Sequence, residues 1–406
     1  MERFELARLL GVTPHVGEPS SRPAVIEEAD PGAFMSAFAT AVAEGGPIFL
    51  ADQAWSLGER EQLATLLARP ATSASAAGRG WLMIPSGGSG GVIKFARHDE
   101  ETISSAVHGF SQHFGVQRVN AVGVLPLHHV SGLMAWMRCV LTGGQYRPWD
   151  WKRLEAGQPP MLPVEGDWFL SLVPTQLQRL LALPDMVVWL RQFRAIFIGG
   201  GPVWPELADA AAQAELPLVL SYGLTETAAM VAAQRPADFL AGKRSCGTVL
   251  PHARLEITAD GVVKITGDAV FRGYWPEWRE ARSFETEDLG QLDEHGQLHI
   301  FGRRDAVIIT GGKKVSPSEV EAALRATGEF SDVVVIGVPD PEWGRAVVAC
   351  HPADMRPPDQ AKIERLLAVR LAAHMRPKRI LAVAAWPRNA QGKVNRAELL
   401  RLIADL

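Results

Sequence analysis

Short apolar runs alternate with helix-like segments from about residue 119 onwards, and this alternation constrains the fold more than any other feature of the sequence. Helix-like segments fill about 175–193 and 204–215. The apolar runs lie at residues 119–127, 168–174, 195–199 and 217–222. Strands that alternate with helices favour a parallel sheet covered on its faces, and ligands of such sheets bind beyond the carboxyl ends of the strands. We therefore predict an α/β fold.

The pattern changes beyond about residue 245. Residues 247–301 alternate between apolar and polar side chains and contain many turns, which is typical of a β-rich subdomain. After the segment GRRDAVIITGGKKVSP the chain returns to short α/β units. We predict a large N-terminal domain over residues 1–304, with its β-rich subdomain at about 245–301, and a small C-terminal α+β domain over residues 305–406.

Charge and cysteine content exclude several classes of protein. The formal net charge is −4 and the pI is about 6.3, values too mild for a protein that binds nucleic acid or an anionic membrane. Cys139, Cys246 and Cys350 lie far apart without C-x-x-C spacing, so they favour neither a disulfide framework nor a zinc site. A reducing, cytoplasmic setting fits them best. The stretch 119–137 is free of charge but contains polar residues and glycines, and we interpret it as a buried strand and loop rather than a membrane span.

Three glycine-bearing segments follow apolar runs, at 85–91, 199–202 and 221–227. Glycines permit close backbone approach, so consecutive amides in the first segment can converge on phosphate oxygens. Its hydroxyls and the lysine that follows add donors and positive charge. A flexible surface loop is the alternative, and the spacing does not match a Walker A loop. The residues concerned are Ser86, Gly87, Gly88, Ser89, Gly90 and Lys94.

The segment from Tyr222 to Thr227 places a hydroxyl and a carboxylate just past a buried apolar run. The carboxylate of Glu226 suits Mg²⁺, which takes oxygen ligands and stays near phosphates. The ring of Tyr222 can stack on a nucleobase. The alternative is a helix N-terminus, with Thr225 or Thr227 as the cap and Glu226 in the first turn.

Two later segments carry charges suited to a nucleotide. Asp288 can accept hydrogen bonds from both hydroxyls of a ribose, and Arg303 supplies a second polar contact. Lys393, in the segment NAQGKVNR, is a compact point charge that can enter a phosphate site. Each of these residues alone also fits a solvated turn or a surface ion pair.

Taken together, in this order and at these separations, the segments resemble the adenylate-forming superfamily of acyl-CoA synthetases, peptide-synthetase adenylation domains and luciferases over residues 85–400. The resemblance implies ATP, Mg²⁺ and coenzyme A: an acid is joined to AMP, and its acyl group then passes to a thiol. It also implies that the large domain is the adenylation domain and that the small domain is mobile.

The resemblance implies a role for each matching residue. The glycine loop and Lys94 would bind phosphate, and Thr225 and Glu226 would contact phosphate and Mg²⁺. Asp288 would hold the ribose, with Arg303 beside it. Adenine would lie against Tyr222, Gly223 and the strand end formed by Gly199, Gly200, Gly201 and Pro202.

The same resemblance covers the C-terminal residues. Lys393 would reach the carboxylate and the α-phosphate during adenylation. Asp305 falls at the hinge, about which the small domain would rotate to bring Gly311, Gly312 and Lys313 toward the site for transfer to the thiol. A homodimer is a further family expectation.

Two departures from the family pattern concern details of the site. The glycine loop lacks the usual threonines and proline before its lysine, and Glu287 stands where the family has a glycine before Asp288. The glycine loop also starts near residue 86, so we expect part of the usual N-terminal subdomain to be trimmed.

The stretch from Pro126 to Arg138 bears on the identity of the acid. It resembles the corresponding region of o-succinylbenzoate-CoA ligases of menaquinone or phylloquinone biosynthesis, as does IFIGGGP. That substrate has a second carboxylate, and a guanidinium pairs with a carboxylate through two hydrogen bonds. Arg138 is our candidate partner, and His129 and Ser131 would line the acyl pocket. An arginine in a helix-surface salt bridge and a satisfied buried histidine are the alternatives.

Three other functions stay open. An aryl- or medium-chain acyl-CoA ligase would have no use for Arg138 as a carboxylate clamp. An adenylation enzyme would load its acyl group onto a separate carrier protein. A degenerate relative would bind nucleotide without catalysis, although the joint presence of Glu226, Asp288, Arg303 and Lys393 argues against it.

Overall fold

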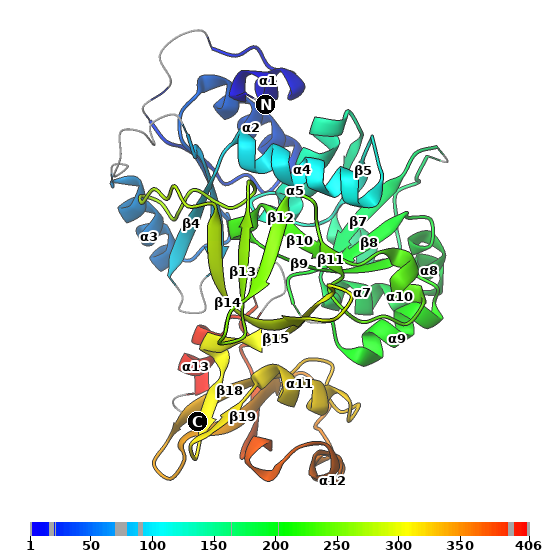
Figure 1. Cartoon of the computed structure of the whole chain (residues 1–406). Helices are drawn as coiled ribbons and strands as arrows, with labels where there is room; N and C mark the ends of the chain where they lie inside the picture. The colour runs from blue at the N-terminus through cyan, green and yellow to red at the C-terminus, as the bar shows by residue number, and fades with distance from the viewer. Residues whose placement is uncertain are drawn as a thin grey trace.

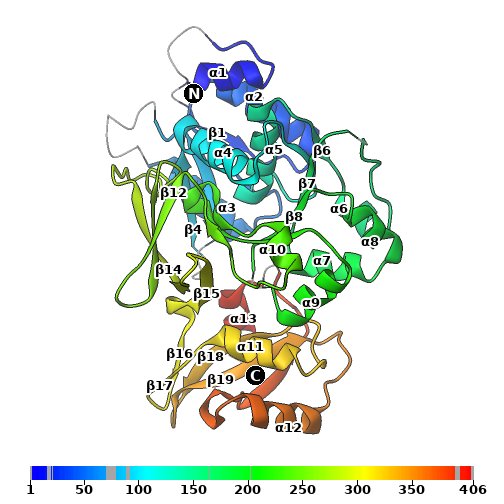
Figure 2. The same cartoon turned by 45° about the vertical axis from the view of Figure 1, so that its right-hand side comes forward.

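The structure is a computed structural model, which describes residues 2–15, 20, 22–69, 79–87, 92–163, 165–201, 203–388 and 394–403. Figure 1 shows a large domain above a smaller one, with the N-terminus at the top of the large domain and the C-terminus in the small one. The turned view in Figure 2 shows the same division. The prediction of an α/β fold with a large N-terminal and a smaller C-terminal domain is confirmed, while the boundary at residues 304 and 305 stays a prediction.

A seven-stranded sheet forms the centre of the large domain, in the order β11-β10-β9-β8-β7-β5-β6. Neighbouring strands from β6 to β9 pair in parallel, and β10 and β11 extend one edge in antiparallel pairing. The four apolar runs predicted as strands are β5, β7, β8 and β9. The strands span Asn120–Gly123 (β5), Tyr146–Pro148 (β6), Trp168–Leu172 (β7), Ala195–Ile198 (β8), Leu218–Leu224 (β9), Ala229–Ala233 (β10) and Thr248–Val249 (β11).

Helices cover both faces of this sheet. One face packs against α4 and α5 through Phe110, Phe114 and Cys139, and the other packs against α6 to α10. The helix expected at 175–193 is two helices, because Pro184 lacks the amide that a continuous helix needs and instead begins α8. The bounds are Glu100–Phe114 (α4), Val130–Thr142 (α5), Trp151–Glu155 (α6), Pro174–Leu181 (α7), Pro184–Leu190 (α8), Pro205–Gln213 (α9) and Pro236–Leu240 (α10).

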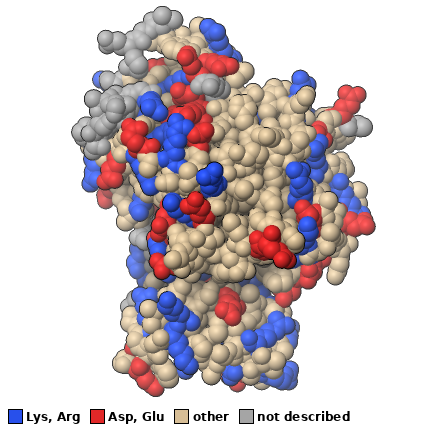
Figure 3. All heavy atoms as spheres, viewed as in Figure 1, with Lys and Arg blue, Asp and Glu red and all other residues tan. Residues whose placement is uncertain are grey.

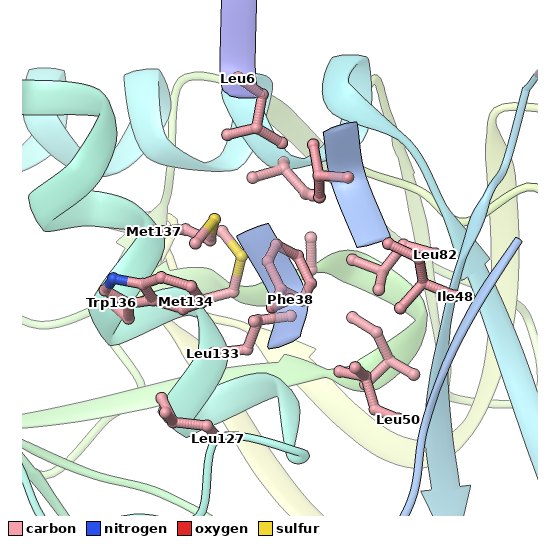
Figure 4. Close-up of a cluster of buried hydrophobic side chains, with 14 of the residues drawn as sticks. Leu6, Phe38, Ile48, Leu50, Leu82, Leu127, Leu133, Met134, Trp136 and Met137 are labelled. Carbon is pink, nitrogen blue, oxygen red and sulfur yellow. The ribbon is translucent and has the colours of Figure 1, made fainter. Parts of the chain in front are cut away.

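A second sheet of the large domain, in the order β1-β2-β3-β4, packs against N-terminal helices and α5. Figure 4 shows Phe38 of α2, Ile48 of β2 and Leu133 of α5 meeting in one buried cluster. The helices α2 and α5 and the strand β2 therefore share one hydrophobic core. The bounds are Arg3–Leu9 (α1), Ala24–Ile26 (β1), Pro31–Glu44 (α2), Ile48–Leu50 (β2), Leu57–Leu67 (α3), Leu82–Gly87 (β3) and Ile93–His98 (β4).

The predicted β-rich segment is an antiparallel sheet in the order β12-β13-β14-β15. Its buried face, with Leu255, Val263 and Ile265, packs against Tyr222 and Val231 of the seven-stranded sheet. The two sheets therefore meet at the strands β9 and β10. The bounds are Ala253–Ile257 (β12), Val262–Gly267 (β13), Ser283–Leu292 (β14) and Leu298–Arg303 (β15).

The small domain combines a three-stranded sheet, a hairpin and helices. α11 and α12 pack with the sheet in one hydrophobic cluster, and Leu399 and Ile403 of α13 pack on its other side. Figures 1 and 2 place α13 between the two domains. The bounds are Ile308–Thr310 (β16), Lys313–Val315 (β17), Pro317–Arg325 (α11), Val334–Asp340 (β18), Gly344–Pro352 (β19), Gln360–Arg370 (α12), Arg379–Val383 (β20) and Arg396–Ile403 (α13).

The described helices include none that is long and apolar enough to cross a bilayer. Figure 3 shows Lys and Arg interspersed with Asp and Glu over one face of the molecule. That face therefore presents no extended field of a single sign, in keeping with the net charge of −4.

Candidate active site

Glu226 is the meeting point of three segments that are far apart in the chain. The hydroxyl of Ser86 donates a 2.7 Å hydrogen bond to Glu226 Oε1, and the hydroxyl of Tyr274 donates a 2.6 Å bond to the same oxygen. Glu226 is 6% exposed. Hydrogen bonds to an ionised acceptor are among the strongest in proteins, so these two hold the carboxylate in one orientation. The end of β3, the turn η2 (Thr225–Thr227) and the loop after β13 thus converge here.

A positive charge lies beside this carboxylate. Lys94 pairs with Ser86 across the β3–β4 hairpin, and its Nζ lies 5.2 Å from the centroid of the Tyr274 ring. Burial, and then the charge of Glu226, raises the pKa of Tyr274, so its hydroxyl stays protonated and donates. Of the predicted glycine loop, Gly87 ends β3. The remaining members fall outside the described residues: Gly88, Ser89 and Gly90.

The buried ring of His98 holds the backbone of η2. Its Nε2 lies 2.8 Å from the carbonyl oxygen of Thr225, and its Nδ1 lies 3.1 Å from Thr102 Oγ1. Burial lowers the pKa of His98 to about 4, so the ring is neutral at neutral pH. Because a carbonyl oxygen can only accept, Nε2 of the neutral ring carries the proton and donates to Thr225. A neutral imidazole therefore positions Thr225.

The turn that follows Glu226 is strained. Ala228 and Ala229 have φ of 48° and 85°, in the left-handed region that costs a residue with a Cβ about 1 kcal/mol or more. The Phe271 amide donates a 2.9 Å hydrogen bond to the Glu226 carbonyl oxygen and helps to hold this conformation. Gly223 has a packing role as well, because a Cβ there would lie 2.1 Å from the carbonyl oxygen of Ala229. Such strain concentrates at functional sites.

Tyr222 and Asp288 form a second contact between distant segments. The Tyr222 hydroxyl donates a 2.7 Å hydrogen bond to Asp288 Oδ2, and Asp288 is 7% exposed. Burial, and then the charge of Asp288, raises the pKa of Tyr222. The pairing of β14 with β15 sets Arg303 opposite Asp288, with Arg303 Nη1 3.7 Å from Asp288 Oδ1. The structure therefore brings these three predicted nucleotide residues together.

Arg303 also binds the predicted hinge residue. Its Nε and Nη2 donate hydrogen bonds of 2.8 and 2.7 Å to the two carboxylate oxygens of Asp305. Asp305 lies in the short turn η3 (Arg304–Ala306) that follows β15. One guanidinium thus contacts both the candidate ribose carboxylate of Asp288 and the predicted hinge residue Asp305.

The predicted adenine-side glycines lie at the end of β8. The parallel pair β8–β9 ends with Ile198 beside Leu220, and Gly199 and Gly200 follow β8 directly. The Gly199 amide donates a 3.3 Å hydrogen bond to the carbonyl oxygen of Leu172. Gly201 follows, and Pro202 falls outside the described residues.

Arg138 lies in a cavity walled by aromatic rings. Its Cζ is 4.3 Å from the ring centroid of Phe110 and 6.0 Å from that of Phe197, and Phe169 and Ser171 also line the cavity. Arg138 is 5% exposed, and within the described part of the chain its Nε has no hydrogen-bond partner. Burial lowers its pKa to about 10, so it stays charged at neutral pH. A buried charge without a full set of partners is costly, and an anion would stabilise it.

The cavity around Arg138 has an accessible volume of about 10 Å³. That is room for roughly one water molecule. An aromatic acid can enter only if the surrounding side chains move apart. The shape seen here is therefore a closed form of any acyl pocket at this place.

His129 and Ser131 lie at the start of the helix that carries Arg138. His129 is the N-cap of α5, and Ser131 is in its first turn. The ring centroids of His128 and His129 are 4.2 Å apart, and His128 Nε2 lies 3.4 Å from Asp52 Oδ2. Burial, and then the neighbouring His128, lowers the pKa of His129 to about 3. The prediction for His129 did not foresee its two polar neighbours.

Lys393 falls outside the described residues. The chain on either side of it is tied together, because Arg388 and Val394 form an isolated antiparallel bridge. The helix α13 that follows is anchored by Arg396, which donates 2.6 Å hydrogen bonds to Glu321 Oε1 and to the carbonyl oxygen of Val335. The segment that bears Lys393 thus joins a helix that lies between the two domains (Figures 1 and 2).

The predicted thiol-side residues form the turn of the β16–β17 hairpin. Gly311 and Gly312 have φ of 53° and 74°, which a two-residue hairpin turn requires, and Lys313 is exposed. Figure 2 shows this hairpin at the outer edge of the small domain, whereas α13 faces the large domain. The predicted rotation of the small domain stays a hypothesis.

Sequence reasoning missed several residues of this site. Tyr274 and His98 lie outside the glycine-bearing segments. Arg272 and Asp99, which form a buried ion pair, also lie outside these segments. Arg272 Nε is 2.9 Å from Asp99 Oδ2, and both side chains are 4% exposed. This pair ties the N-cap of α4 to the loop that carries Tyr274. The available signal was a charge inside an otherwise apolar segment, as in FRGYW at 271–275.

Comparison with known families shows the family to which the chain belongs. The model of the family "AMP-binding enzyme" matches residues 26–275, and that of the "AMP-binding enzyme C-terminal domain" matches residues 319–393. The chain belongs to the AMP-binding enzymes. The first match includes Ser86, Tyr222 and Glu226, and the second ends at Lys393. The resemblance to adenylate-forming enzymes is therefore confirmed.

Several named enzymes are similar to the chain in sequence. A 2-succinylbenzoate–CoA ligase of Geobacillus kaustophilus (strain HTA426) is 34% identical over 300 residues, which are 70% of this chain and 61% of that protein. An indoleacetate–CoA ligase of Aromatoleum aromaticum (strain DSM 19018 / LMG 30748 / EbN1) is 31% identical over 301 residues, which are 69% of this chain and 58% of that protein. The aligned part of the chain spans about 60% of the length of these relatives.

Solved structures match over nearly the whole chain. The o-succinylbenzoate CoA synthetase (MenE) of Bacillus subtilis, in complex with the acyl-adenylate OSB-AMP, has a TM-score of 0.78 at 21% identity and covers 98% of this chain and 91% of its own. ATP-bound MatB of Rhodopseudomonas palustris has a TM-score of 0.78 at 22% identity, with coverage of 98% and 91%. The fold is therefore that of an adenylate-forming enzyme.

Proposed function

We propose that the protein is an ATP-dependent acid–thiol ligase that forms an acyl-adenylate and then an acyl-CoA thioester, with o-succinylbenzoate as the acid. The convergence of Tyr222, Glu226 and Asp288 carries the proposal. Tyr222 is hydrogen-bonded to Asp288, and Glu226, on the turn that follows β9, is hydrogen-bonded to Ser86. A single molecule of ATP could therefore contact all four residues.

In the first half-reaction, a carboxylate oxygen of the acid attacks the α-phosphorus of ATP, and pyrophosphate leaves. Negative charge grows on the phosphate oxygens, so donors and positive groups aimed at them lower the barrier. Ser86 and Lys94 are paired near the turn of the β3–β4 hairpin. From there they could supply a hydroxyl donor and a positive charge to the phosphate oxygens. The oriented carboxylate of Glu226 fits Mg²⁺, which prefers oxygen donors and would neutralise phosphate charge.

The nucleoside would bind on the other side of Tyr222. The Tyr222 hydroxyl donates its hydrogen bond to Asp288 Oδ2. The other carboxylate oxygen, Oδ1, lies 3.7 Å from Arg303 Nη1 and would accept hydrogen bonds from the ribose hydroxyls. Adenine would stack on the Tyr222 ring beside Gly199, Gly200 and Gly201. In this arrangement Asp288 of the antiparallel sheet β12–β15 would contact the ribose, and Ser86 of the sheet β1–β4 would contact the phosphates. The nucleotide would therefore bind where these sheets meet.

The second half-reaction would follow rotation of the small domain about Asp305. Lys393 would stabilise the transition state of adenylation and then leave, and Gly311, Gly312 and Lys313 would take its place on the thiol side. Hinge motions of this kind commonly complete or exchange the residues of a site. The contact of Arg303 with Asp305 supports a hinge coupled to the nucleotide site.

The choice of acid rests on Arg138. A charged guanidinium inside a cavity lined by Phe110, Phe169 and Phe197 suits an aromatic ring that carries an anionic group. o-Succinylbenzoate offers a second carboxylate in addition to the one that is activated. The relatives named 2-succinylbenzoate–CoA ligase, and the likeness to a structure with bound OSB-AMP, support the same choice. A role in menaquinone or phylloquinone biosynthesis follows from this acid.

An aryl-acid–CoA ligase is the second candidate. The similarity to an indoleacetate–CoA ligase favours it, because the cavity is aromatic and indoleacetate has one carboxylate. In that case Arg138 would have no carboxylate to bind.

A substrate screen tests the proposal. Turnover that requires both ATP and coenzyme A would be measured with o-succinylbenzoate, benzoate, indoleacetate and a medium-chain fatty acid. We expect kcat/KM for o-succinylbenzoate to exceed the others by at least about tenfold, since a site built for a polar group rejects acids that lack it. A preference for indoleacetate or benzoate would favour the second candidate, and absence of turnover with every acid would contradict both.

We also propose a cytoplasmic location and a homodimer. The described cysteines are all free, which suits a reducing compartment. Light scattering of the purified protein would decide the oligomeric state, and cell fractionation would decide the location.

A further inference from the structure

Asp52, His128 and His129 form a cluster of donors apart from the proposed nucleotide site. One ligand atom from each residue lies within 4.8 Å of those of the other two. His128 Nε2 lies 3.4 Å from Asp52 Oδ2, and these side chains are 10% and 15% exposed. The ring centroids of the two histidines are 4.2 Å apart. Three side chains that commonly bind metals thus converge in a largely buried space.

The backbone orients the carboxylate of Asp52. The Ala54 amide donates a 2.8 Å hydrogen bond to Asp52 Oδ1, and Oδ2 faces His128. Asp52 lies two residues after the end of the strand β2. The amide of the residue before it, Ala51, donates a hydrogen bond to the Ile26 carbonyl oxygen and so holds the backbone at this point. A hydrogen-bonded carboxylate that presents its other oxygen is the usual arrangement of a metal ligand.

The two histidines are held by the start of α5. The His129 amide donates a 3.2 Å hydrogen bond to the Pro126 carbonyl oxygen, which closes the loop that carries both rings. Gly132 packs so closely on this loop that a Cβ there would lie 2.2 Å from the same oxygen. In Figure 4, Leu133 of α5 lies across the core from Leu50 of β2, so the core fixes α5 beside the end of β2.

Two ring nitrogens of the cluster lack a well-aligned hydrogen bond. Nε2 of His129 is buried and has no hydrogen-bond partner within the described ranges of the chain, and the buried Nε2 of His128 forms no well-aligned hydrogen bond but lies 3.4 Å from Asp52 Oδ2. His128 as a whole is 8% exposed. Buried polar atoms in folded proteins nearly always have a partner, and each exception requires an explanation. A ligand that both nitrogens bind would provide one.

Two imidazoles and a carboxylate are a donor set for a divalent transition metal. Zn²⁺ binds nitrogen at about 2.0–2.1 Å and oxygen at about 2.0–2.2 Å, which sets tetrahedral donors roughly 3.4 Å apart. Asp52 and His128 already have this separation. The ligand atoms of the three residues all lie within 4.8 Å of one another, so rotation of the His129 side chain has to close at most roughly 1.4 Å.

We propose that Asp52, His128 and His129 bind one Zn²⁺ ion and leave its fourth position open. The cysteine spacing gave no indication of a zinc site, because these donors are histidine and aspartate. The proposal does not depend on the acyl-CoA chemistry, and Mg²⁺ would not compete for the site because it prefers oxygen ligands. A bound ion would hold the first turn of α5, the helix that also carries Ser131 and Arg138.

Titration of the metal-free full-length protein with Co²⁺ tests the proposal, because bound Co²⁺ absorbs visible light and can be displaced by Zn²⁺. We expect one Co²⁺ per chain and complete displacement by one equivalent of Zn²⁺. Asp52→Asn and His128→Gln should each weaken Co²⁺ binding by at least about tenfold, the loss that follows from disturbing even the groups behind metal ligands.

His299→Gln is the matched control. His299 Nε2 lies 3.2 Å from Asp293 Oδ2, a histidine–aspartate pair that belongs to no group of three donors in the described part of the chain. This variant should bind Co²⁺ like the wild type. Asp52→Asn keeps an oxygen acceptor for the Ala54 amide, and circular dichroism would verify that it folds. Equal binding by the wild type and both cluster variants, or no binding by the wild type, would overturn the proposal.

Discussion

The hydroxyl of Tyr222 donates a 2.7 Å hydrogen bond to Asp288, a residue 66 positions further along the chain. Tyr222 lies on β9 of the seven-stranded sheet, and Asp288 lies on β14 of the antiparallel sheet. The bond therefore fastens the β-rich subdomain to the carboxyl edge of the parallel strands, where ligands of such sheets bind. Two segments that were assigned separately to a nucleotide meet in space.

Tyr222→Phe tests this bond. The substitution keeps the ring for stacking but removes the donor that orients Asp288. A hydrogen bond to a charged group contributes roughly 1.5–3 kcal/mol, so we expect KM for ATP to rise by about tenfold or more while kcat changes less. Initial rates at varied ATP measure the effect. Tyr146→Phe, on a strand away from this contact, is the control, and an unchanged KM in Tyr222→Phe would refute the role of the bond.

Arg138→Ala tests the choice of acid. Loss of a buried guanidinium that pairs with a carboxylate commonly costs roughly 2–5 kcal/mol, so kcat/KM for o-succinylbenzoate should fall by about a hundredfold. Benzoate, which lacks a second carboxylate, should be affected much less. Arg138→Lys keeps the positive charge but cannot form two parallel hydrogen bonds to a carboxylate. Its kcat/KM for o-succinylbenzoate should therefore lie between those of the wild type and Arg138→Ala. Equal losses for both acids would remove the dicarboxylate hypothesis.

Asp305→Pro tests the hinge. Proline fixes the backbone φ of the residue, so rotation between the two half-reactions should be hindered. We expect thioester formation to be impaired more than adenylation, each measured in single-turnover reactions. Asp305→Ala is the control, because it also removes the two hydrogen bonds from Arg303 but leaves the backbone free. Equal impairment of both steps by Asp305→Pro would contradict the hinge role.

His98→Gln tests the neutral imidazole that holds Thr225. Burial lowers the pKa of His98 to about 4. In the unfolded chain the value is about 6.5. As pH falls through 6.5, the unfolded state takes up the proton first, so the stability that the neutral ring contributes above that pH is lost progressively down to about pH 4. The difference between the folded-state and unfolded-state pKa values of His98 corresponds to roughly 3 kcal/mol in the free energy of unfolding.

Urea unfolding at about pH 7 and pH 5 measures this dependence. The wild type should lose more stability on acidification than His98→Gln, whose amide can still donate to the Thr225 carbonyl oxygen. His295→Gln is a control at an exposed position and should behave like the wild type. An identical pH dependence in His98→Gln and the wild type would show that His98 does not carry the effect.

Much of the fold follows from local patterns in the sequence. The apolar runs at 195–199 and 217–222 predicted β8 and β9, since buried parallel strands are apolar on both faces. The alternating segment 247–301 predicted the antiparallel sheet in the same way. The helix expected at 175–193 was wrong in one respect, because the prediction did not use Pro184 as the start of a second helix.

The sequence predicted those residues of the site that belong to a short motif, but not the contacts between distant motifs. Ser86 and Glu226 each belong to a motif, but the hydrogen bond between residues 140 positions apart depends on how the sheets pack. Tyr274 joins them from a third segment that carries no glycine signal. The same reasoning explains why Asp52 was missed: it meets His128 only because the core holds α5 beside the end of β2.

Acid-dependent exchange of pyrophosphate into ATP is the most direct test of the central claim, that these distant segments and Lys393 act together on one ATP. The wild type should exchange only with Mg²⁺ and a suitable acid. Lys393→Ala should lower this exchange by about 10²–10³-fold, the loss typical of one charge-stabilising donor, and should still form thioester from pre-made adenylate. Exchange near the wild-type rate in Lys393→Ala would contradict the account.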